Sequence, residues 1–582
     1  MKNNYYLKME QMKTQSLLST YTKSLTLLFL LFLGQSVISQ SVNYDWAKGI
    51  GGTSLDEGSS ITHDAMGNIY VTGRFYGTVD FNPGAAINNL TSNGTSDIYV
   101  LKLDASGNYI WAKQIGGVGQ DKGNAIHVDV AGNIFVTGFF SDTVDFDPGT
   151  ATSNLISGGI KDIFILKINS LGNFIWAKQI GSDGNDEGYD IVTDSKRDIY
   201  LTGNYYNTVD FDPGTGVSNS TSTGLFDVFV LKLNFLGNYV WVKTVGGTNV
   251  EQSFSIDVDT ASNVFTTGYF NATVDFDPGT GTANLTSNGM RDIYVLKLDA
   301  SGNYVWAKNI GGGAQDMGKD LVIDNSGDVL ITGQFQYLTD FDPGAGTANQ
   351  TSSGIVDSFI LKLDANGNYV WAKQYGGTNL ENSESISLDN NENIYTTGNF
   401  YGTADFDPGT GTANLTAVGI SSDIFVLKLD ASGNYIWAGR MGGSSDDIGN
   451  SITVDNSCNI YSTGYYFDSV DFDPGVPTDF LVSNGSADLY VQKLSCQTTV
   501  GLDNDFIENN ISIYPNPTSS QVTISDTDKE ISNITIIDIT GKVVLSLKPE
   551  NTEIDLSMLK NGIYFMKIQQ GDEFVTKKII KK

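Results

Sequence analysis

One phrase of 65 residues repeats along most of this chain, and the repeat limits the folds that the chain can adopt. All seven tryptophans of the sequence occupy the same place in the phrase, spaced by 65 residues five times and then by 66. They are Trp46, Trp111, Trp176, Trp241, Trp306, Trp371 and Trp437. The string Asp-Phe-Asp-Pro-Gly, with Asn as its third residue in the first copy, keeps step with them from Asp80 to Asp471. A fixed period of this length indicates a repeat architecture.

Each copy predicts four β-strands. In the first copy the strands cover residues 59–64, 68–75, 97–104 and 108–115, which are rich in Ile, Val, Tyr, Phe and Thr. Short turns with a glycine join the first strand to the second and the third to the fourth. The strands are apolar on both faces, so both faces must be covered. Sheets packed face to face around an axis, as propeller blades, meet that need.

The ends of the array predict that it closes on itself. It begins with a fourth strand, residues 44–50, and stops after a third strand, residues 488–494. The first strand can therefore complete the last sheet and leave no open edge. We expect an all-β chain with a seven-bladed β-propeller over residues 43–496, closed by its N-terminal strand. A polar linker (497–510) and a small C-terminal β-sandwich (511–582) are expected to follow.

Charge and hydropathy limit the partners and the location. Residues 40–510 hold 21 basic and 56 acidic side chains, a formal charge of −35. Such a surface repels nucleic acids, so we expect no nucleic-acid partner. Residues 1–39 predict a signal peptide, because Lys23 precedes a largely apolar run of 9 residues (25–33). A membrane span needs about 18 apolar residues, and no other stretch approaches that, so we expect a secreted monomer.

The two cysteines, Cys458 and Cys496, both fall in the last copy of the repeat. A disulfide between them would pin the end of the array in an oxidising compartment. Two free thiols are the alternative, because intervening strands could hold the Cα atoms farther apart than the roughly 7 Å that a disulfide spans.

The phrase from Gly51 to Phe75, with its pattern GG…D…G…I..D..GN.YVTG, resembles the SBBP-type β-propeller repeat. The resemblance recurs in all seven copies and covers residues 43–496. Two copies depart from it, because Glu251 and Glu381 stand where the others have Asp, and Ser253 and Ser383 stand where the others have Gly. The seven loops are therefore not expected to be equal.

Residues 511–582 are similar to the C-terminal sorting domain of the type IX (Por) secretion system. The matching strings are IYPNPTSSQVTI from Ile513, ITGKVV from Ile539, IDLSMLKNGIYFMKI from Ile554 and KKIIKK from Lys577. They place the sorting-signal motif at Tyr514, Pro515, Asn516, Pro517, Gly541, Lys542, Gly562, Tyr564, Lys577 and Lys578. The resemblance implies export through the type IX secretion machinery of a gram-negative bacterium, followed by release or by attachment to the outer-membrane surface.

Residues that recur in every copy are best explained as structural. The lysine at Lys102 and its equivalents lies in an apolar strand, and we expect it to pair with a repeated aspartate of the same sheet. The aspartates of Asp-Phe-Asp-Pro-Gly are expected to cap a Pro-Gly turn. Alternatively, aspartates one residue apart could hold Ca²⁺, which takes six to eight oxygens. The candidates are Asp145, Asp147, Asp210, Asp212, Asp275 and Asp277. No other cofactor is expected.

Motifs of catalysis are missing from the sequence. It has no GxSxG string, no cysteine with an evident histidine partner, and only two histidines, His63 and His127, at different places in the repeat. The long loops are predicted to share one end of the sheets, where a rigid scaffold usually carries recognition. Because these loops resemble one another, they suit a repetitive ligand such as a glycan or surface polysaccharide. We expect a binding or structural module without enzymatic activity. The alternatives are an extracellular carbohydrate-active enzyme with an acidic site on the long-loop face, and a scaffold with no ligand.

Overall fold

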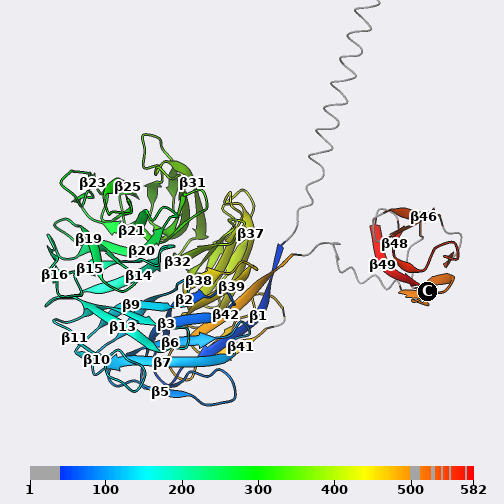
Figure 1. Ribbon diagram of the computed structural model, residues 1–582. Helices are drawn as coiled ribbons and strands as arrows, with labels where there is room; N and C mark the ends of the chain where they lie inside the picture. Colours follow the sequence, from blue (N-terminus) through cyan, green and yellow to red (C-terminus); the bar gives the residue numbers. More distant parts are fainter. Residues whose placement is uncertain are drawn as a thin grey trace, which may run out of the picture. The chain divides into compact units, whose positions relative to one another are not determined.

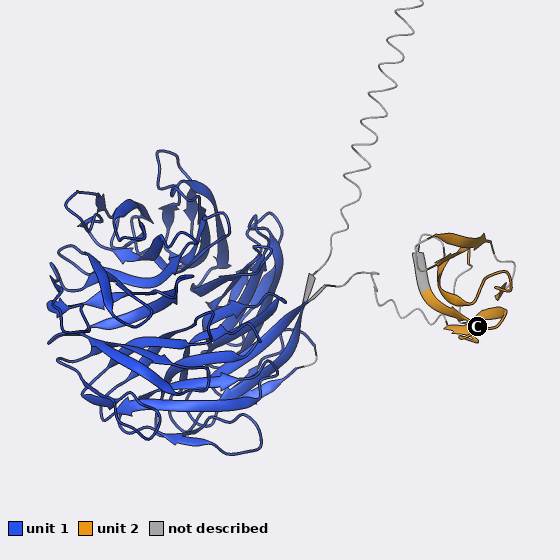
Figure 2. Ribbon diagram, viewed as in Figure 1, with its two compact units in different colours: residues 1–498 blue, residues 499–582 orange. Residues whose placement is uncertain are grey.

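The computed structural model describes residues 40–476, 478–498, 512–525, 531–538, 542–548, 552–570 and 573–582. These residues form strands and turns without a helix, and the described part of the chain therefore holds no helix that could cross a membrane. The chain divides into two compact units, residues 1–498 and 499–582, coloured separately in Figure 2. The predicted signal peptide and residues 499–510 of the predicted linker lie outside the described residues.

Each repeat contributes to a sheet of four antiparallel strands, as its sequence predicts. The first strands are β2 (Glu57–His63), β8 (Lys122–Val128), β14 (Glu187–Thr193), β20 (Gln252–Val258), β26 (Met317–Ile323), β32 (Glu381–Leu388) and β38 (Ile448–Val454). The second strands are β3 (Ile69–Phe75), β9 (Ile134–Phe140), β15 (Ile199–Tyr205), β21 (Val264–Phe270), β27 (Val329–Phe335), β33 (Ile394–Tyr401) and β39 (Asn459–Tyr466).

The third and fourth strands complete the sheets. The third strands are β6 (Asp97–Leu103), β12 (Asp162–Ile168), β18 (Asp227–Leu233), β24 (Asp292–Leu298), β30 (Asp357–Leu363), β36 (Ser422–Leu429) and β42 (Asp488–Thr498). The fourth strands are β1 (Gln40–Ile50), β7 (Tyr109–Gly117), β13 (Phe174–Ile180), β19 (Tyr239–Val245), β25 (Tyr304–Gly312), β31 (Tyr369–Gly377) and β37 (Tyr435–Gly443).

The strand registers separate the two ends of every sheet. Between β2 and β3, His63 lies opposite Ile69 beside the tight turn, and Glu57 lies opposite Arg74 at the other end. We call these ends the short-turn face and the long-loop face. The long loops and the tight turns therefore lie at opposite ends, as expected.

The first strands surround a common axis. Each first strand lies beside the first strand of the next repeat, and β38 lies beside β2. In Figure 1 the labels β2, β14, β20, β32 and β38 gather at the centre of unit 1, whereas β5, β10, β11, β16 and β23 lie at its periphery. The sheets are thus arranged like the blades of a propeller.

The N-terminal strand completes the last sheet. β1 pairs antiparallel with β42, with Val42 opposite Cys496 and Ile50 opposite Leu489, in a sheet of order β1-β42-β39-β38. The first and last copies of the repeat are therefore joined by backbone hydrogen bonds, which removes the edge that β42 would otherwise expose.

Apolar layers between neighbouring sheets form the core of unit 1. One such layer combines Tyr70 and Val100 of the first repeat with Ile134 and Phe164 of the second, all fully buried. Because each sheet contributes to a layer on both of its faces, its strands carry apolar residues on both faces. Burial of each large side chain contributes about 1.5–3 kcal/mol.

The repeated tryptophan and lysine connect neighbouring sheets. Trp111 Nε1 and Lys102 Nζ donate to Ser170 O, which lies in a tight turn of the next repeat, at 3.4 and 3.2 Å. The expected ion pair with a repeated aspartate of the same sheet occurs at Lys362, whose Nζ lies 2.7 Å from Asp324. Lys232 instead pairs, at 3.2 Å, with Asp198, which replaces the asparagine of most other repeats. For Lys102 the expected pair is wrong, because its ammonium group reaches the turn carbonyl of the adjacent sheet.

The long loop after each second strand contains a short hairpin that the sequence did not predict. The hairpins are β4 (Thr78–Asp80) with β5 (Asn89–Thr91), β10 (Thr143–Asp145) with β11 (Asn154–Ile156), β16 (Thr208–Asp210) with β17 (Asn219–Thr221), β22 (Thr273–Asp275) with β23 (Asn284–Thr286), β28 (Leu338–Asp340) with β29 (Asn349–Thr351), β34 (Thr403–Asp405) with β35 (Asn414–Thr416), and β40 (Ser469–Asp471) with β41 (Phe480–Val482). In the second repeat, Asp145 of β10 pairs with Gly116 of β7 in the preceding sheet. The hairpin therefore fastens one sheet to the next.

Unit 2 contains two antiparallel sheets. Its strands are β43 (Ser512–Tyr514), β44 (Gln521–Ser525), β45 (Asn533–Asp538), β46 (Val543–Leu547), β47 (Glu553–Asp555), β48 (Gly562–Gln570) and β49 (Glu573–Lys581). The sheet orders are β43-β44-β47 and β46-β45-β48-β49. Val522 and Ile554 of the first sheet share a buried core with Ile536 and Met566 of the second.

Candidate binding site at the long-loop face

The aspartates of the repeated Asp-Phe-Asp-Pro-Gly string cap turns. Asp145 Oδ1 accepts the N–H groups of Asp147 and Ser153 at 3.1 and 2.8 Å, and Asp147 Oδ1 accepts that of Gly149 at 2.8 Å. The pairs Asp210 with Asp212 and Asp275 with Asp277 make the same contacts. Among the described residues, no group of three or more His, Cys, Asp or Glu side chains could hold a metal. Calcium at these aspartates stays a prediction.

A second set of acids is buried at the long-loop face, one in each repeat. Asp56 Oδ2 accepts the N–H of Gly52 at 2.7 Å, and Asp56 Oδ1 accepts that of Tyr76 at 3.0 Å. Glu251 and Glu381 take the same role in the two divergent repeats, where they accept the N–H groups of Gly247 and Gly377. These loops are therefore more alike than the sequence suggests, because the longer glutamate side chain reaches the equivalent donor.

Burial raises the pKa of each of these seven acids more than the backbone donors lower it. The pKa values rise to about 6 for Asp186 and Asp316, to about 7 for Asp56, Asp121 and Glu251, and to about 8 for Glu381 and Asp447. Because each of the five aspartates connects two loops, its protonation is coupled to the stability of the long-loop face.

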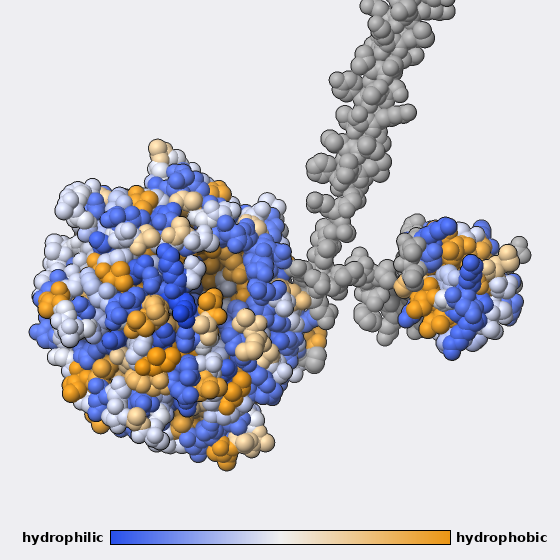
Figure 3. Space-filling model, viewed as in Figure 1, coloured by the Kyte–Doolittle hydropathy of each residue, from blue (hydrophilic) through white to orange (hydrophobic). Residues whose placement is uncertain are grey.

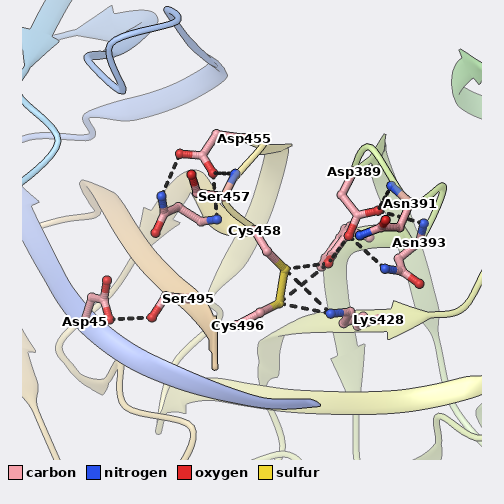
Figure 4. Close-up of a disulfide and its surroundings, with 12 residues drawn as sticks. Asp45, Asp389, Asn391, Asn393, Lys428, Asp455, Ser457, Cys458, Ser495 and Cys496 are labelled. Atoms are coloured by element: carbon pink, nitrogen blue, oxygen red, sulfur yellow. Dashed lines mark hydrogen bonds between the residues drawn. A yellow bond between two sulfur atoms is a disulfide. The ribbon is translucent and has the colours of Figure 1, made fainter. Parts of the chain in front are cut away.

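Cys458 and Cys496 form a disulfide, with their Cα atoms 5.4 Å apart. The strands β39 and β42 are hydrogen-bonded neighbours with Asn459 opposite Ser495, so no strand separates the two cysteines. Lys428 Nζ lies 3.0 Å from Cys496 Sγ, as Figure 4 shows. Burial lowers the pKa of Lys428 to about 8.

The other repeats show why a disulfide fits at this place. A Cβ atom added at Gly67, which is equivalent to Cys458, would lie 3.3 Å from the Cβ of Ala105, which is equivalent to Cys496. Gly132 and Ser170 approach in the same way, at 3.7 Å. In the last repeat the chain does not turn into a fourth strand here, because β1 supplies that strand. The disulfide therefore holds the place that a tight turn holds in the other sheets.

Neither histidine lies in a catalytic arrangement. His63 Nδ1 lies 3.1 Å from Thr453 Oγ1, and His127 Nε2 lies 2.9 Å from Thr193 Oγ1. Burial lowers the pKa of His63, and it lowers that of His127 to about 4. Both side chains thus connect neighbouring first strands as neutral hydrogen-bonding groups.

The repeats differ most at the long-loop ends of the first strands. The residues at the start of these strands are Glu57, Lys122, Glu187, Gln252, Met317, Asn382 and Ile448. Two residues later the repeats carry Ser59, Asn124, Tyr189, Phe254, Lys319, Glu384 and Asn450. In a symmetric array, selective chemistry is expected where the copies differ, so these side chains form the candidate site.

Ion pairs begin a continuous row of contacts around the axis. Glu57 Oε2 lies 2.9 Å from Arg74 Nε, and Glu57 Oε1 lies 2.8 Å from Lys122 Nζ of the next repeat. Burial alone would raise the pKa of Glu57, but Lys122 and Arg74 together hold it below its usual value. Lys122 lies opposite Phe139 in the strand register.

The row continues through the second and third repeats. Lys161 Nζ lies 3.8 Å from the centre of the Phe139 ring and 2.7 Å from Glu187 Oε1. The ring of Tyr189 lies 5.7 Å from that of Phe254 and nearly perpendicular to it, at 81°. The row therefore combines cations, carboxylates and aromatic rings.

Phe254 is the point where the row branches. Lys319 Nζ lies 5.1 Å from the centre of its ring and 3.0 Å from Glu384 Oε2. On the other side, the ring of Tyr269 lies 5.9 Å from Phe254, and the Arg291 guanidinium lies 4.4 Å from the centre of the Tyr269 ring.

We call this set the axial belt. It comprises Glu57, Arg74, Lys122, Phe139, Lys161, Glu187, Tyr189, Phe254, Tyr269, Arg291, Lys319 and Glu384. Its ion-paired side chains are partly exposed, from 10% for Glu57 to 28% for Arg74. The sequence analysis missed these residues, although an alignment of the seven copies would have marked them as the positions that vary.

Two cavities lie away from the axial belt. One, of about 280 Å³, is lined by Tyr44, Trp437 and Asp473, and the other, of about 320 Å³, is lined by Gln374, Asp405 and Asp407, among others. Most of these residues have equivalents in the other repeats, so the two cavities offer less selective chemistry than the belt.

The predicted sorting-signal residues meet across unit 2. Asn516 Nδ2 donates to Lys578 O at 2.6 Å, and Asn516 Oδ1 accepts the N–H of Ile580 at 2.9 Å. The Tyr514-Pro515 and Asn516-Pro517 bonds are cis. Tyr564 OH donates to Lys560 O at 2.8 Å. The remaining predicted residues take separate places: Gly562 begins β48, Lys577 lies in β49, Lys542 N donates to Asp538 Oδ1, and Gly541 lies outside the described residues.

Two protein families match parts of the chain. Residues 512–582 match the secretion system C-terminal sorting domain, and residues 110–138 and 175–204 match the beta-propeller repeat known as SBBP. Both resemblances seen in the sequence are therefore confirmed. The sorting domain indicates export through the type IX system to the cell surface or the extracellular space.

Two curated proteins resemble the chain at low sequence identity. An uncharacterized WD repeat-containing protein of Acanthamoeba polyphaga mimivirus is 25% identical over 501 residues, which cover 72% of this chain and 36% of the viral protein. The regulatory protein FlaEY of Caulobacter vibrioides is 26% identical over 110 residues, which cover 19% of this chain and 12% of FlaEY. The chain thus spans about a third or less of the length of these relatives.

Two solved structures are also similar. A protein of unknown function from Bacteroides caccae is 10% identical, with a TM-score of 0.25, and the match covers 57% of this chain and 94% of that one. PorZ, a surface component of the type IX secretion system of Porphyromonas gingivalis, is 9% identical, with a TM-score of 0.15, and the match covers 92% and 100% of the two chains. Similarity at these levels supports no conclusion about function.

Proposed function

We propose, from a chain that carries SBBP-type β-propeller repeats and a type IX sorting domain, that this protein is a seven-bladed propeller which binds a ligand outside the cell. Its small C-terminal β-sandwich is the export signal, and the axial belt on the long-loop face is the binding site. The observation that carries the proposal is the contrast within the repeat. The two acid sets and the tryptophan recur in every copy and hold the sheets together, whereas the belt residues vary.

The composition of the belt favours binding of a glycan. The half-buried rings of Tyr189 and Phe254 offer flat faces against which the C–H groups of a sugar ring can pack, and the neighbouring charged groups can hydrogen-bond to hydroxyls. Figure 3 shows hydrophobic residues scattered among hydrophilic ones on the visible face of unit 1, without one broad apolar interface. Such a surface suits a polar ligand better than a large protein partner.

The ion pairs of the belt favour binding over hydrolysis. A glycosidase needs one carboxylic acid whose pKa is raised, so that it can protonate the leaving group. In the belt, Glu57 has a lowered pKa and two cationic partners, and Glu187 and Glu384 each pair with a lysine. These three carboxylates therefore do not supply the acid of a glycosidase, and the seven acids with raised pKa values at the same face are fully buried.

A glycan array probed with the full chain tests the proposal. We expect the array to identify a bound glycan, no release of reducing ends from it, and a loss of affinity of at least about tenfold in the variant Phe254→Ala, the change that corresponds to 1.4 kcal/mol. Phe235→Ala is the matched control, because Phe235 lies in a tight turn on the short-turn face and is 41% exposed. Absence of any bound glycan, or equal affinity in Phe254→Ala, would contradict the proposal.

A further inference from the structure

The cations of unit 1 are not evenly distributed. Of the 21 basic residues between residues 40 and 510, seven are the repeated lysines of the third strands and six are the repeated lysines of the fourth strands. Of the other eight, five belong to the axial belt, namely Arg74, Lys122, Lys161, Arg291 and Lys319. The belt holds only three carboxylates, so it is locally cationic on a unit whose formal charge is strongly negative.

Screening by salt gives the charges close to a bound ligand more weight than distant ones. At physiological ionic strength the Debye length is about 8 Å, so exposed charges farther away are largely screened. A short ligand at the belt therefore interacts mainly with nearby charges, which are the belt's five cations and three carboxylates together with adjacent acids such as Glu251 and Asp446. A long polyanion such as nucleic acid would also meet the acidic surface around the belt.

Arg291 differs from the other four cations of the belt. Arg74, Lys122, Lys161 and Lys319 each form an ion pair with a glutamate. Within the part of the chain that the structure describes, Arg291 forms no ion pair. Its guanidinium lies 4.4 Å from the centre of the Tyr269 ring, and its Nη1 lies 3.8 Å from Met317 Sδ.

The surroundings of Arg291 position its guanidinium and use only one of its N–H donors, in a hydrogen bond to Met317 Sδ. Tyr269 is 3% exposed, so the arginine covers a ring that is itself packed against Phe254. A guanidinium carries five N–H donors in a planar fork that matches a carboxylate or a sulfate with two parallel hydrogen bonds. Arg291 is therefore held in place for an anion that comes from outside the chain.

The aromatic row places a sugar ring beside that anion. Phe254 lies between Tyr269, which carries Arg291, and Lys319, whose Nζ is 5.1 Å from the Phe254 ring centre. A ligand that packs on Phe254 thus has the ion-paired ammonium of Lys319 at that ring and, at the neighbouring Tyr269 ring, a guanidinium that forms no ion pair among the described residues. We infer that the ligand of the axial belt is an anionic glycan, whose carboxylate or sulfate group pairs with Arg291 while its sugar ring packs on Phe254. This inference rests on the proposed function and names the ligand class for the same site.

The test compares three oligosaccharides of equal length by calorimetry with the full chain: an oligouronate, a sulfated oligosaccharide and a neutral one. We expect at least one of the two anionic ligands to bind at least about tenfold more tightly than the neutral ligand, and Arg291→Gln to remove that advantage. The matched control is Arg197→Gln, because Arg197 lies 5.5 Å from the Phe235 ring in a comparable stack on the short-turn face. Equal melting temperatures of the two variants would show that both remain folded.

The outcomes separate this inference from the proposed function. If the neutral ligand binds as tightly as both anionic ones, and Arg291→Gln binds like the wild type while Phe254→Ala does not, the anionic class is wrong and the binding site stands. If no oligosaccharide binds, or if Phe254→Ala and Arg291→Gln both bind like the wild type, both proposals fail. If Arg197→Gln loses as much affinity as Arg291→Gln, the effect is one of net charge and the inference is overturned.

Discussion

We expect removal of residues 512–582 to reduce the extracellular amount of this protein to background and to leave the rest of the chain inside the cell envelope. The reason is that these residues form a compact unit of their own, with its own core, and match the sorting domain of the type IX system. Immunoblots of medium, cell surface and periplasm would measure the effect.

The matched control for this deletion is a fusion of residues 499–582 to an unrelated periplasmic protein, which we expect to reach the surface or the medium. Normal export of the truncated chain would refute the role of unit 2 as the export signal. Retention of the fusion would show that residues 499–582 are not sufficient for export.

We expect the melting temperature of the protein to fall by about 5 °C or more as the pH rises from 6.5 to 9. The folded-state pKa values of Asp121, Glu381 and Asp447 are raised by burial to about 7, 8 and 8, above those of the unfolded chain. The folded state therefore binds more protons in this window, and the stability that protonation provides is lost as the pH rises through these values. A shift of one pKa unit at a single site corresponds to about 1.4 kcal/mol, so several sites give a measurable change.

The two histidines do not contribute to the change in stability between pH 6.5 and pH 9. Burial lowers the pKa of His63 and lowers that of His127 to about 4, so both destabilise the fold only as the pH falls below their unfolded value near 6.5. Calorimetric scans at constant ionic strength measure the effect. A melting temperature that stays constant or rises between pH 6.5 and pH 9 would show that the seven acids are already ionised in the folded protein.

The four strands of the first repeat could be predicted from the sequence to within about two residues, whereas the closing strands β1 and β42 each extend four residues beyond the prediction. The reason is that hydrophobic alternation and a fixed period gave seven independent copies of the same information. The short hairpin β4–β5 could not be predicted in this way. Its strands have three residues each, and in the equivalent hairpin β10 is held by the fourth strand of a neighbouring sheet, so its stability comes from tertiary contacts.

The repeat predicts the fold, but it does not predict the candidate site, because the site consists of residues that vary among the copies. Attention to residues shared by all copies led to Asp145 and Asp147, which cap a turn. The axial belt depends on residues such as Phe254 and Arg291, whose equivalents vary among the copies, and on the register that brings six repeats to one axis. Strand order also determines whether the two cysteines can form a disulfide. They can, because β39 and β42 are neighbours and leave no strand between Cys458 and Cys496.

The axial belt exists only if the ring closes, so that the last repeat returns to the first. An experimental density map of the secreted protein tests this closure most directly. The map should show seven sheets around one axis, with Val42 of β1 opposite Cys496 of β42. Six or eight sheets, or an N-terminal strand that lies apart from β42, would contradict it.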